Sequence, residues 1–301
     1  MTLNKVLSSL GYKELRVLFK QIENIPYIHM KGEVLSLQAY NLLGVRHIGD
    51  FDFLVPRINL KEIEMKLDQC GFVETNTSRV HKITMLSASQ QVAPWIKPLP
   101  FTKTKSIEID LNFDVFWGEY AGKRIDISEF VSGYIYMDIY GCKVKALTPL
   151  KSMIQLILHH YNDMNSLYLL SVTKSIKYSM FKDVYNLFKN NLDTITIESL
   201  YKLSEKYEII PYVYYVFYHT GLLFADDDLK KYIAAFKTSA GEALLNFYGL
   251  HDHERRHWKV DFKTRLESDN LYNYIKDDLT EKDIEKIELN KRIFIPKEYE
   301  V

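Results

Sequence analysis

Two aspartates separated by one residue, Asp50 and Asp52, stand in an apolar run of the chain. In a β-strand successive side chains point to opposite faces, so the two carboxylates share one face while Phe51 and Phe53 occupy the other. Two like charges this close raise each other's pKa unless a cation lies between them. Mg²⁺ takes oxygen ligands and is usually held by one or two carboxylates together with substrate phosphates. The spacing therefore indicates a magnesium site, against the simpler alternative that an isolated Asp-x-Asp pair lies on a solvated strand face.

The residues before this pair predict a strand, a glycine turn and a helix. We expect the strand over residues 26–30, the turn at Lys31 and Gly32, and the helix over residues 33–43 with Gly44 as its stop. A glycine at a strand-to-helix turn lets backbone N–H groups approach a phosphate, and the N-terminus of a helix favours anions. Lys31 adds a positive charge there. The segment therefore predicts a phosphate-binding turn beside the metal site.

A third carboxylate is expected if metal ions are to bridge an attacking oxygen and a phosphorus centre, and residues 106–114 offer candidates. Alternation with a period of two separates a polar face of this segment from an apolar one. The polar face holds Glu108, Asp110, Asn112 and Asp114, and the apolar face holds Ile107, Ile109, Leu111 and Phe113. Any half-buried strand shows this alternation, so the segment alone does not identify a site.

The order of these motifs resembles a known family, the uncharacterised bacterial nucleotidyltransferases of the DNA polymerase β-like superfamily. This resemblance implies an α+β fold, in which a polymerase β-like nucleotidyltransferase domain with a mixed sheet is followed by a mostly α-helical domain. The motifs that carry the resemblance are, in chain order, Lys31-Gly32, Arg46, Asp50-Phe51-Asp52 with Leu54-Val55, Ile109–Phe113, Leu158-His159 and Lys182-Asp183-Val184.

The resemblance also implies a reaction. A nucleoside monophosphate would pass from an NTP such as ATP to an acceptor nucleophile, with release of pyrophosphate and with Mg²⁺ or Mn²⁺ as the metal. Asp50, Asp52 and Asp110 would bind the metal pair, and Asp110 could also act as the base for the acceptor. The acceptor stays open between a small molecule, a sugar, a peptide, a protein and an RNA end.

The resemblance places other residues at or near the substrate. Lys31, Gly32 and Arg46 would lie at the triphosphate, and His159 and Asp183 match helical positions of the family. Each has a structural alternative. Lys31 and Arg46 could form ion pairs that orient the aspartate loop, and a histidine on the apolar helix after residue 149 is ordinarily a hydrogen-bonded core residue.

Two residues depart from the family pattern. Glu33 follows Gly32 where serine or glycine is usual, and Asn112 replaces a histidine. A second functional class therefore stays open. In it, the chain is a degenerate nucleotidyltransferase-fold protein that binds nucleotide or a partner protein without turnover, as a regulatory or toxin–antitoxin component. Glu33 in the phosphate turn is the residue that favours this alternative.

Residues 251–257 contain three histidines and two acids. On a helix His253 and His257 would share a face at i, i+4 spacing, as zinc ligands can. No third ligand is fixed by the sequence and the surrounding segment is polar, so a solvated segment is favoured. In the same way Tyr212, Tyr214, Tyr215 and Tyr218 favour a helical core over base stacking.

Composition bounds the remaining classes. The chain has 301 residues, with 39 basic and 39 acidic side chains, so no global basic field indicates a nucleic-acid partner. Cys70 and Cys142 lack metal-ligand spacing, and no run approaches the roughly 20 apolar residues of a membrane helix. We expect a soluble protein in the reducing cytoplasm, with no membrane partner.

The pattern predicts two domains, a catalytic domain over residues 1–147 and a helical domain over residues 148–301, because Thr148-Pro149 forms a helix start. Within the first domain we expect helices over 4–23 and 59–70, strands over 72–75 and 80–85, a proline-rich loop over 91–104 and a hairpin over 134–147. Beyond it we expect helices over 149–161, 179–190, 197–208, 211–218, 227–235 and 241–247.

Overall fold

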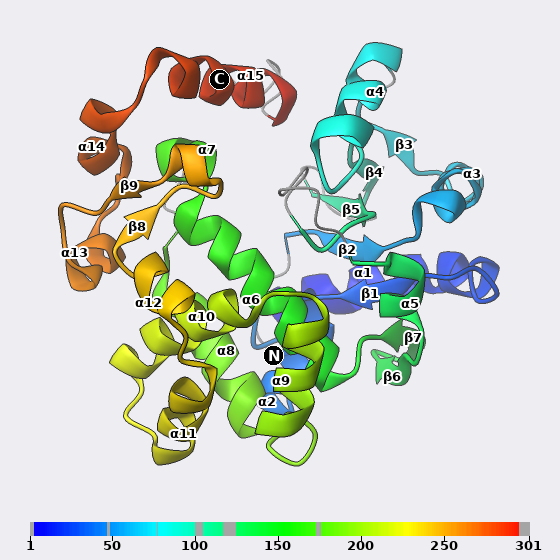
Figure 1. Cartoon of the computed structure of the whole chain (residues 1–301). Coiled ribbons are helices and arrows are strands. Elements are labelled where there is room, and N and C mark those ends of the chain that lie inside the picture. Colours follow the sequence, from blue (N-terminus) through cyan, green and yellow to red (C-terminus); the bar gives the residue numbers. More distant parts are fainter. Residues whose placement is uncertain are drawn as a thin grey trace. The chain divides into compact units, whose positions relative to one another are not determined.

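A computed structural model describes residues 3–46, 49–76, 78–99, 105–116, 125–172 and 176–294 of the chain (Figure 1). The chain forms two compact units, each of which is described by itself. The first comprises Met1–Glu119, Lys123–Met153 and Asn186–Ile195, and the second comprises Tyr120–Gly122, Ile154–Tyr185 and Thr196–Val301. The domain limits expected from the sequence stay a prediction.

The first unit is built on a mixed sheet, whose described strands follow the order β3-β4-β5-β2-β1-β7-β6. Strand β2 runs parallel to β5, and β1 runs parallel to β7, while the other neighbours are antiparallel. The strands are β1 Ile28–Met30, β2 Phe51–Leu54, β3 Val73–Glu74, β4 Trp95–Pro98, β5 Ser106–Asn112, β6 Ile135–Ile139 and β7 Cys142–Ala146. The expected hairpin is confirmed in β6 and β7.

The helices of the first unit are α1 Leu3–Gln21, α2 Gly32–Tyr40, α3 Leu60–Gln69, α4 Arg79–Ala88 and α5 Ile127–Val131, with a 3₁₀ turn η1 at Arg57–Asn59. The helices expected over residues 4–23 and 59–70 are thereby confirmed within a few residues. Helix α2 is shorter than expected, because Asn41 adopts the left-handed conformation at φ 52° and ends it before Gly44.

The apolar face of the central strands packs against α1, which lies alongside β1 and β2 in Figure 1. The ring centroid of Phe51 lies 5.3 Å from that of Tyr12, and the centroid of Phe53 lies 5.8 Å from that of Phe19. Gly11 permits this approach, since a Cβ there would lie 2.6 Å from the Phe51 ring. The expected alternation is confirmed, and Asp52 faces away from this core.

Two expectations for the first unit are wrong. Residues 80–85 belong to α4 and not to a strand, because Ser78 caps the helix through the His81 N–H and because exposed Val80 and Ile83 have no core to face. The proline-rich segment contains β4, which pairs with β5. Pro98 ends that strand, where the loss of one N–H is tolerated. Residues 100–104 lie outside the described part.

A short return segment, Asn186–Ile195, also belongs to the first unit. The Asn190 side chain donates a hydrogen bond of 2.7 Å to the carbonyl of Ala39, and that of Asn191 donates one of 3.0 Å to the carbonyl of Gln38. Both carbonyls lie at the C-terminal end of α2, where helix carbonyls have no partner within the helix.

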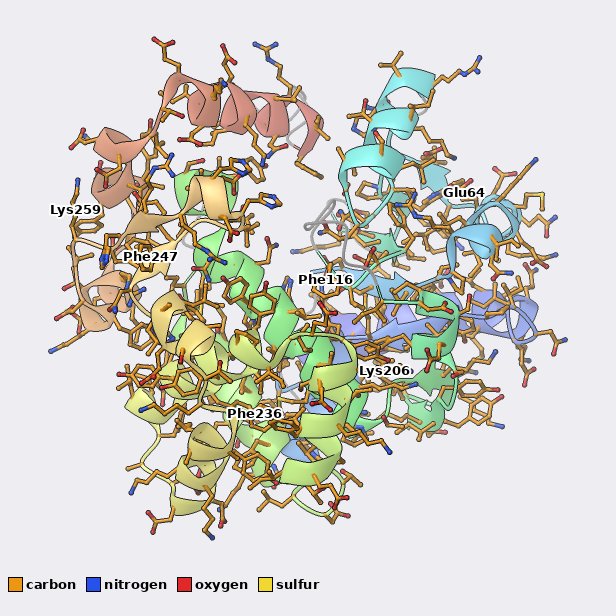
Figure 2. The ribbon with its side chains drawn as sticks, viewed as in Figure 1. Glu64, Phe116, Lys206, Phe236, Phe247 and Lys259 are labelled. Carbon is orange, nitrogen blue, oxygen red and sulfur yellow. The ribbon has the colours of Figure 1, made fainter. Side chains whose placement is uncertain are left out.

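The second unit is mainly helical, and Figure 2 labels Phe236 and Phe247 among its side chains. Phe236 is fully buried and packs on Tyr201 and Phe217 at centroid distances of 5.5 and 6.3 Å. The elements are α6 Pro149–Asn165, α7 Leu167–Val172, α8 Tyr178–Lys189, α9 Ile197–Lys206, α10 Ile210–Leu223, α11 Asp227–Phe236, α12 Ser239–Leu244, α13 Phe262–Glu267, α14 Tyr272–Ile275, α15 Glu281–Phe294, β8 Phe247–Tyr248, β9 Arg256–His257, η2 Asp252–Glu254 and η3 Lys276–Asp278. Helix α6 begins in the first unit, and helix α8 ends in it.

The helices expected over 149–161, 179–190, 197–208, 211–218 and 227–235 are confirmed as α6, α8, α9, α10 and α11. The helix expected over 241–247 ends at Leu244 in α12, and Phe247 begins β8. Helix α7 and the helices after α12 were not predicted. Tyr212, Tyr214 and Tyr215 are buried in α10, which confirms their assignment to a core. Among the described helices none is both long and apolar enough to cross a membrane.

Candidate active site

Strands β2 and β5 bring two of the expected carboxylates together. Their parallel register pairs Asp52 with Asp110, and both residues are buried, at 4% and 9% exposure. Asp50 directly precedes β2 and is partly buried. Asp114 lies past the end of β5, and its carboxylate accepts hydrogen bonds from the backbone N–H groups of Val115 and Phe116 instead. Asp52 and Asp110 are therefore neighbours in the sheet, and Asp50 lies next to the start of β2.

These carboxylates strongly affect one another's protonation. Burial raises the pKa of Asp110 to about 8, with further increases from Asp52, Asp50 and Glu108. Burial and then Asp52 also raise the pKa of Asp50. Within the described part of the chain, Oδ1 of Asp110 is buried and accepts no hydrogen bond. Concentrated negative charge with a buried, unsatisfied oxygen favours a cation at this place.

Lys31 supplies the one charged contact to Asp52 that the described atoms show. Its Nζ lies 2.8 Å from Oδ1 of Asp52, and the side-chain amide of Asn112 donates to the same oxygen at 3.2 Å. Asn112, at the position of the family histidine, thus orients Asp52. Lys31 also lowers the pKa of Asp50 and Asp110, which partly offsets the mutual repulsion.

The turn between β1 and α2 has an unusual backbone. Lys31 is the N-cap of α2 at φ 56° and ψ −145°, and Gly32 follows at φ 41°. A positive φ is rare for a residue with a side chain and is concentrated at functional sites. The Lys31 side chain makes no capping bond and pairs with Asp52 instead. The N-terminus of α2 therefore begins at a lysine whose ammonium is paired with Asp52, and helix N-termini favour anions such as phosphate.

Glu33 lies in the first turn of α2, but its carboxylate is hydrogen-bonded to other segments of the chain. Its side chain is fully buried, where Oε2 accepts a 2.7 Å hydrogen bond from the N–H of Gly44 and Oε1 accepts one of 2.9 Å from the hydroxyl of Tyr140. Ser36 adds two more bonds, to the carbonyl of Leu42 at 2.8 Å and from the N–H of Val45 at 3.3 Å. Glu33, which departs from the family pattern, thus stabilises the loop that leads to Arg46.

Arg46 is partly buried and lies close enough to lower the pKa of Asp50. This interaction suits an ion pair that orients the aspartate and also suits a phosphate contact. His47 and Ile48, which belong to the same motif, lie outside the described residues.

His29 was not expected at the site. Its Nδ1 donates to the backbone carbonyl of Asp52 at 3.1 Å, and its Nε2 is hydrogen-bonded to the hydroxyl of Tyr12. Burial lowers the pKa of His29 to about 4, so the ring is neutral at pH 7. The sequence could have indicated that His29 supports Asp52 only through the position of this histidine in the strand before the aspartates.

His159 and Asp183 belong to the second unit, and their assignment to nucleotidyl transfer stays a prediction. His159 lies on α6, with Nε2 at 3.4 Å from Oδ2 of Asp163, and Asp183 is buried on α8. His253 and His257 do not share a helix, because they lie in η2 and β9. The i, i+4 zinc geometry considered for them is therefore absent.

Comparison with known proteins shows the family of the chain. The chain belongs to the uncharacterised nucleotidyltransferase family, whose model matches residues 4–225, as the motifs predicted. No curated protein matches the chain.

Two solved structures are similar to the chain. An antigenic nucleotidyltransferase-like protein from Paracoccidioides brasiliensis is 17% identical, with a TM-score of 0.40 over 77% of this chain and 92% of that chain. The antibiotic-resistance factor ANT(2'')-Ia is 10% identical, with a TM-score of 0.38 over 68% of this chain and 92% of that chain. The expected fold class, an α+β unit with a mixed sheet and a largely helical second part, is confirmed.

Proposed function

We propose that this chain transfers a nucleoside monophosphate from an NTP to an acceptor nucleophile and releases pyrophosphate, with Mg²⁺ or Mn²⁺ as the metal. The observation that carries the proposal is the pairing of Asp52 with Asp110 across β2 and β5, beside Asp50 and with a buried carboxylate oxygen left unsatisfied. Oxygen donors of this kind fit a hard divalent cation. The proposal agrees with membership of the nucleotidyltransferase family.

The carboxylates of Asp50, Asp52 and Asp110 would hold the cation. When bound, it would offset their charge and stabilise the charge that develops on the attacking and leaving oxygens. In the metal-free protein burial and the neighbouring carboxylates raise the pKa of Asp110 to about 8, and a bound cation would lower it, so that the carboxylate would be ionised and able to accept a proton. We assign Asp110 as the base that accepts the proton of the acceptor nucleophile, at a carboxylate oxygen.

The turn at Lys31 and Gly32 would bind the triphosphate. Phosphoryl transfer asks the protein chiefly for positioning and charge, and the first turn of α2 supplies N–H donors beside the lysine ammonium. Arg46, close to Asp50, would add a second cation to this end of the site. The acceptor is a small molecule, a sugar, a peptide, a protein or an RNA end, and the balanced charge of the chain disfavours long nucleic acids.

The non-catalytic alternative depended on Glu33. Since its carboxylate accepts hydrogen bonds from Gly44 and Tyr140, its presence after Gly32 has a structural explanation. The residue therefore no longer favours binding without turnover.

The direct test incubates the purified protein with each α-³²P-labelled NTP and Mg²⁺ or Mn²⁺, in the presence of a lysate of its host. Wild type is compared with Asp50→Asn/Asp52→Asn and with Asp68→Asn, an exposed acid on α3 that serves as the matched control. Label on a discrete component, made by wild type and control only, supports the proposal and defines the base and acceptor class. Nucleotide binding by calorimetry without label transfer under either metal would reject it in favour of a binding module.

A further inference from the structure

Three side chains of α6 with metal-binding donors lie close together in the second unit. Oδ2 of Asp163 lies 3.4 Å from Nε2 of His159 and 3.8 Å from Nδ1 of His160. The donor atoms all lie within 4.8 Å of one another, a spacing that no other group of three His, Cys, Asp or Glu side chains in the described part of the chain meets, the group of Asp50, Asp52 and Asp110 included. His159 matches a helical position of the family, and no role described above involves His160 or Asp163.

The burial of His160 is an independent observation. The residue is only 4% exposed, yet neither of its ring nitrogens makes a hydrogen bond to any described group. Its distance to Asp163 is too long for a hydrogen bond. Buried polar groups are nearly always satisfied, since leaving one unpaired costs free energy. A ligand on the ring nitrogen that faces Asp163 would satisfy it.

Helix geometry explains why the three groups converge. Side chains at i, i+3 and i, i+4 are neighbours on a helix surface, so Asp163 lies next to both His160 and His159. Two donors held about 2.1 Å from one tetrahedral Zn²⁺ lie roughly 3.4 Å apart, close to the separations of Asp163 from both histidines. The side chain of His159 is 38% exposed, which leaves an entry path for the ion.

We propose that α6 binds a borderline transition-metal dication of the Zn²⁺ class through His159, His160 and Asp163. Imidazole nitrogens combined with a carboxylate select such ions, whereas Mg²⁺ prefers oxygen ligands alone. The site is therefore chemically distinct from the cluster of Asp50, Asp52 and Asp110, and it does not depend on nucleotidyl transfer. With three protein ligands, the ion keeps at least one position for water or another ligand.

The test measures metal binding, not activity. Tag-free, full-length protein carrying Asp50→Asn/Asp52→Asn, which weakens the oxygen-ligand site, is titrated with ZnCl₂ by calorimetry and with CoCl₂ by visible absorption. His159→Ala and Asp163→Asn are compared with His253→Ala/His257→Ala, a matched pair from the exposed histidine-rich segment. Circular dichroism checks that each variant is folded. Of the two α6 variants His159→Ala is the less disruptive, because the side chain of His159 is 38% exposed and that of Asp163 is 20% exposed.

We expect one Zn²⁺ per chain, cobalt ligand-field bands of a low-coordinate nitrogen and oxygen site, and at least a tenfold loss of affinity in His159→Ala and Asp163→Asn. The control should bind as the parent does. No binding by the parent, equal binding by parent and α6 variants, or loss of binding in the control alone would each overturn the proposal. In the first of these cases Asp163 is simply an ion-pair partner of His159.

Discussion

Asp52 on β2 and Asp110 on β5 are direct partners across a parallel strand pair, and both are buried on the face opposite the aromatic core. Fifty-seven residues separate the two aspartates along the chain. Among the described atoms, the carboxylate of Asp52 accepts a hydrogen bond from the amide of Asn112 and forms an ion pair with the ammonium of Lys31. The predictions below follow from this pairing and from the residues that hold it.

Replacing Asp52 should abolish turnover without unfolding the protein. In Asp52→Asn the side chain keeps its shape and loses a metal ligand, while its repulsion of Asp110 and Asp50 disappears. We expect pyrophosphate release to fall at least about a hundredfold, since charge stabilisation by the metal is worth several kcal/mol. A coupled pyrophosphate assay measures this, with Asp68→Asn as control. Wild-type rate and Mg²⁺ dependence in Asp52→Asn would refute the assignment.

Asp110 should make the metal-free protein less stable as pH rises. Its pKa is about 8 in the folded protein against 3.8 for the free group, so the folded state binds more protons between these values. The free energy of unfolding should therefore fall from about pH 4 to pH 8, by at most about 1.4 kcal/mol per pH unit. Denaturation in EDTA tests this. Asp110→Asn should flatten the dependence, and added Mg²⁺ should stabilise wild type more at pH 8 than at pH 5.

Lys31 distinguishes a phosphate contact from a purely structural ion pair. If the ammonium binds the triphosphate, Lys31→Met should weaken NTP binding about 10- to 100-fold, the value of a hydrogen bond to a charged group. Calorimetry with a non-hydrolysable NTP analogue and Mg²⁺ measures the affinity. The control is Lys61→Met, at an exposed position of α3. Unchanged affinity together with a lower turnover rate would assign Lys31 to orienting Asp52 alone.

Glu33 should stabilise the loop between α2 and β2. Glu33→Ala removes the acceptor for Gly44 and Tyr140, and we expect a loss of about 2–4 kcal/mol in the free energy of unfolding. Tyr140→Phe should cost about 1 kcal/mol alone and almost nothing in the Glu33→Ala background. Urea denaturation of the four proteins completes the cycle. Strict additivity would show that the two side chains do not interact.

Gly11 should not tolerate a methyl group. A Cβ there would lie 2.6 Å from the ring of Phe51, a core side chain next to the aspartates. We expect Gly11→Ala to cost about 1–3 kcal/mol through overpacking. Gly49→Ala is the matched control for thermal unfolding, because nothing in the described structure lies within 4 Å of a Cβ at that position. Equal melting temperatures for the two variants would contradict the close packing.

Local sequence patterns predicted a strand or helix correctly where one face of the element is apolar and packs on the core. Alternation in residues 106–112 correctly separated Ile109 and Leu111 from Asp110, because the side-chain period of a strand is fixed by its backbone. The same rule failed at residues 80–85, where capping by Ser78 and an exposed position favour the helix α4. The proline content of residues 91–104 likewise led to the prediction of a loop in place of β4. Pro98 ends that strand and leaves its pairing with β5 intact.

By itself, the sequence determined the family to which the chain belongs, and it predicted the three aspartates and the glycine turn as candidate site residues. Only the tertiary structure decided that Asp52 pairs with Asp110, that Glu33 faces inward to Gly44 and Tyr140, and that His29 supports the aspartate strand. The physical reason is the range of the interactions. Periodicity and turn chemistry act over a few neighbouring residues, whereas strand register, burial and the resulting pKa shifts depend on groups brought together from distant parts of the chain.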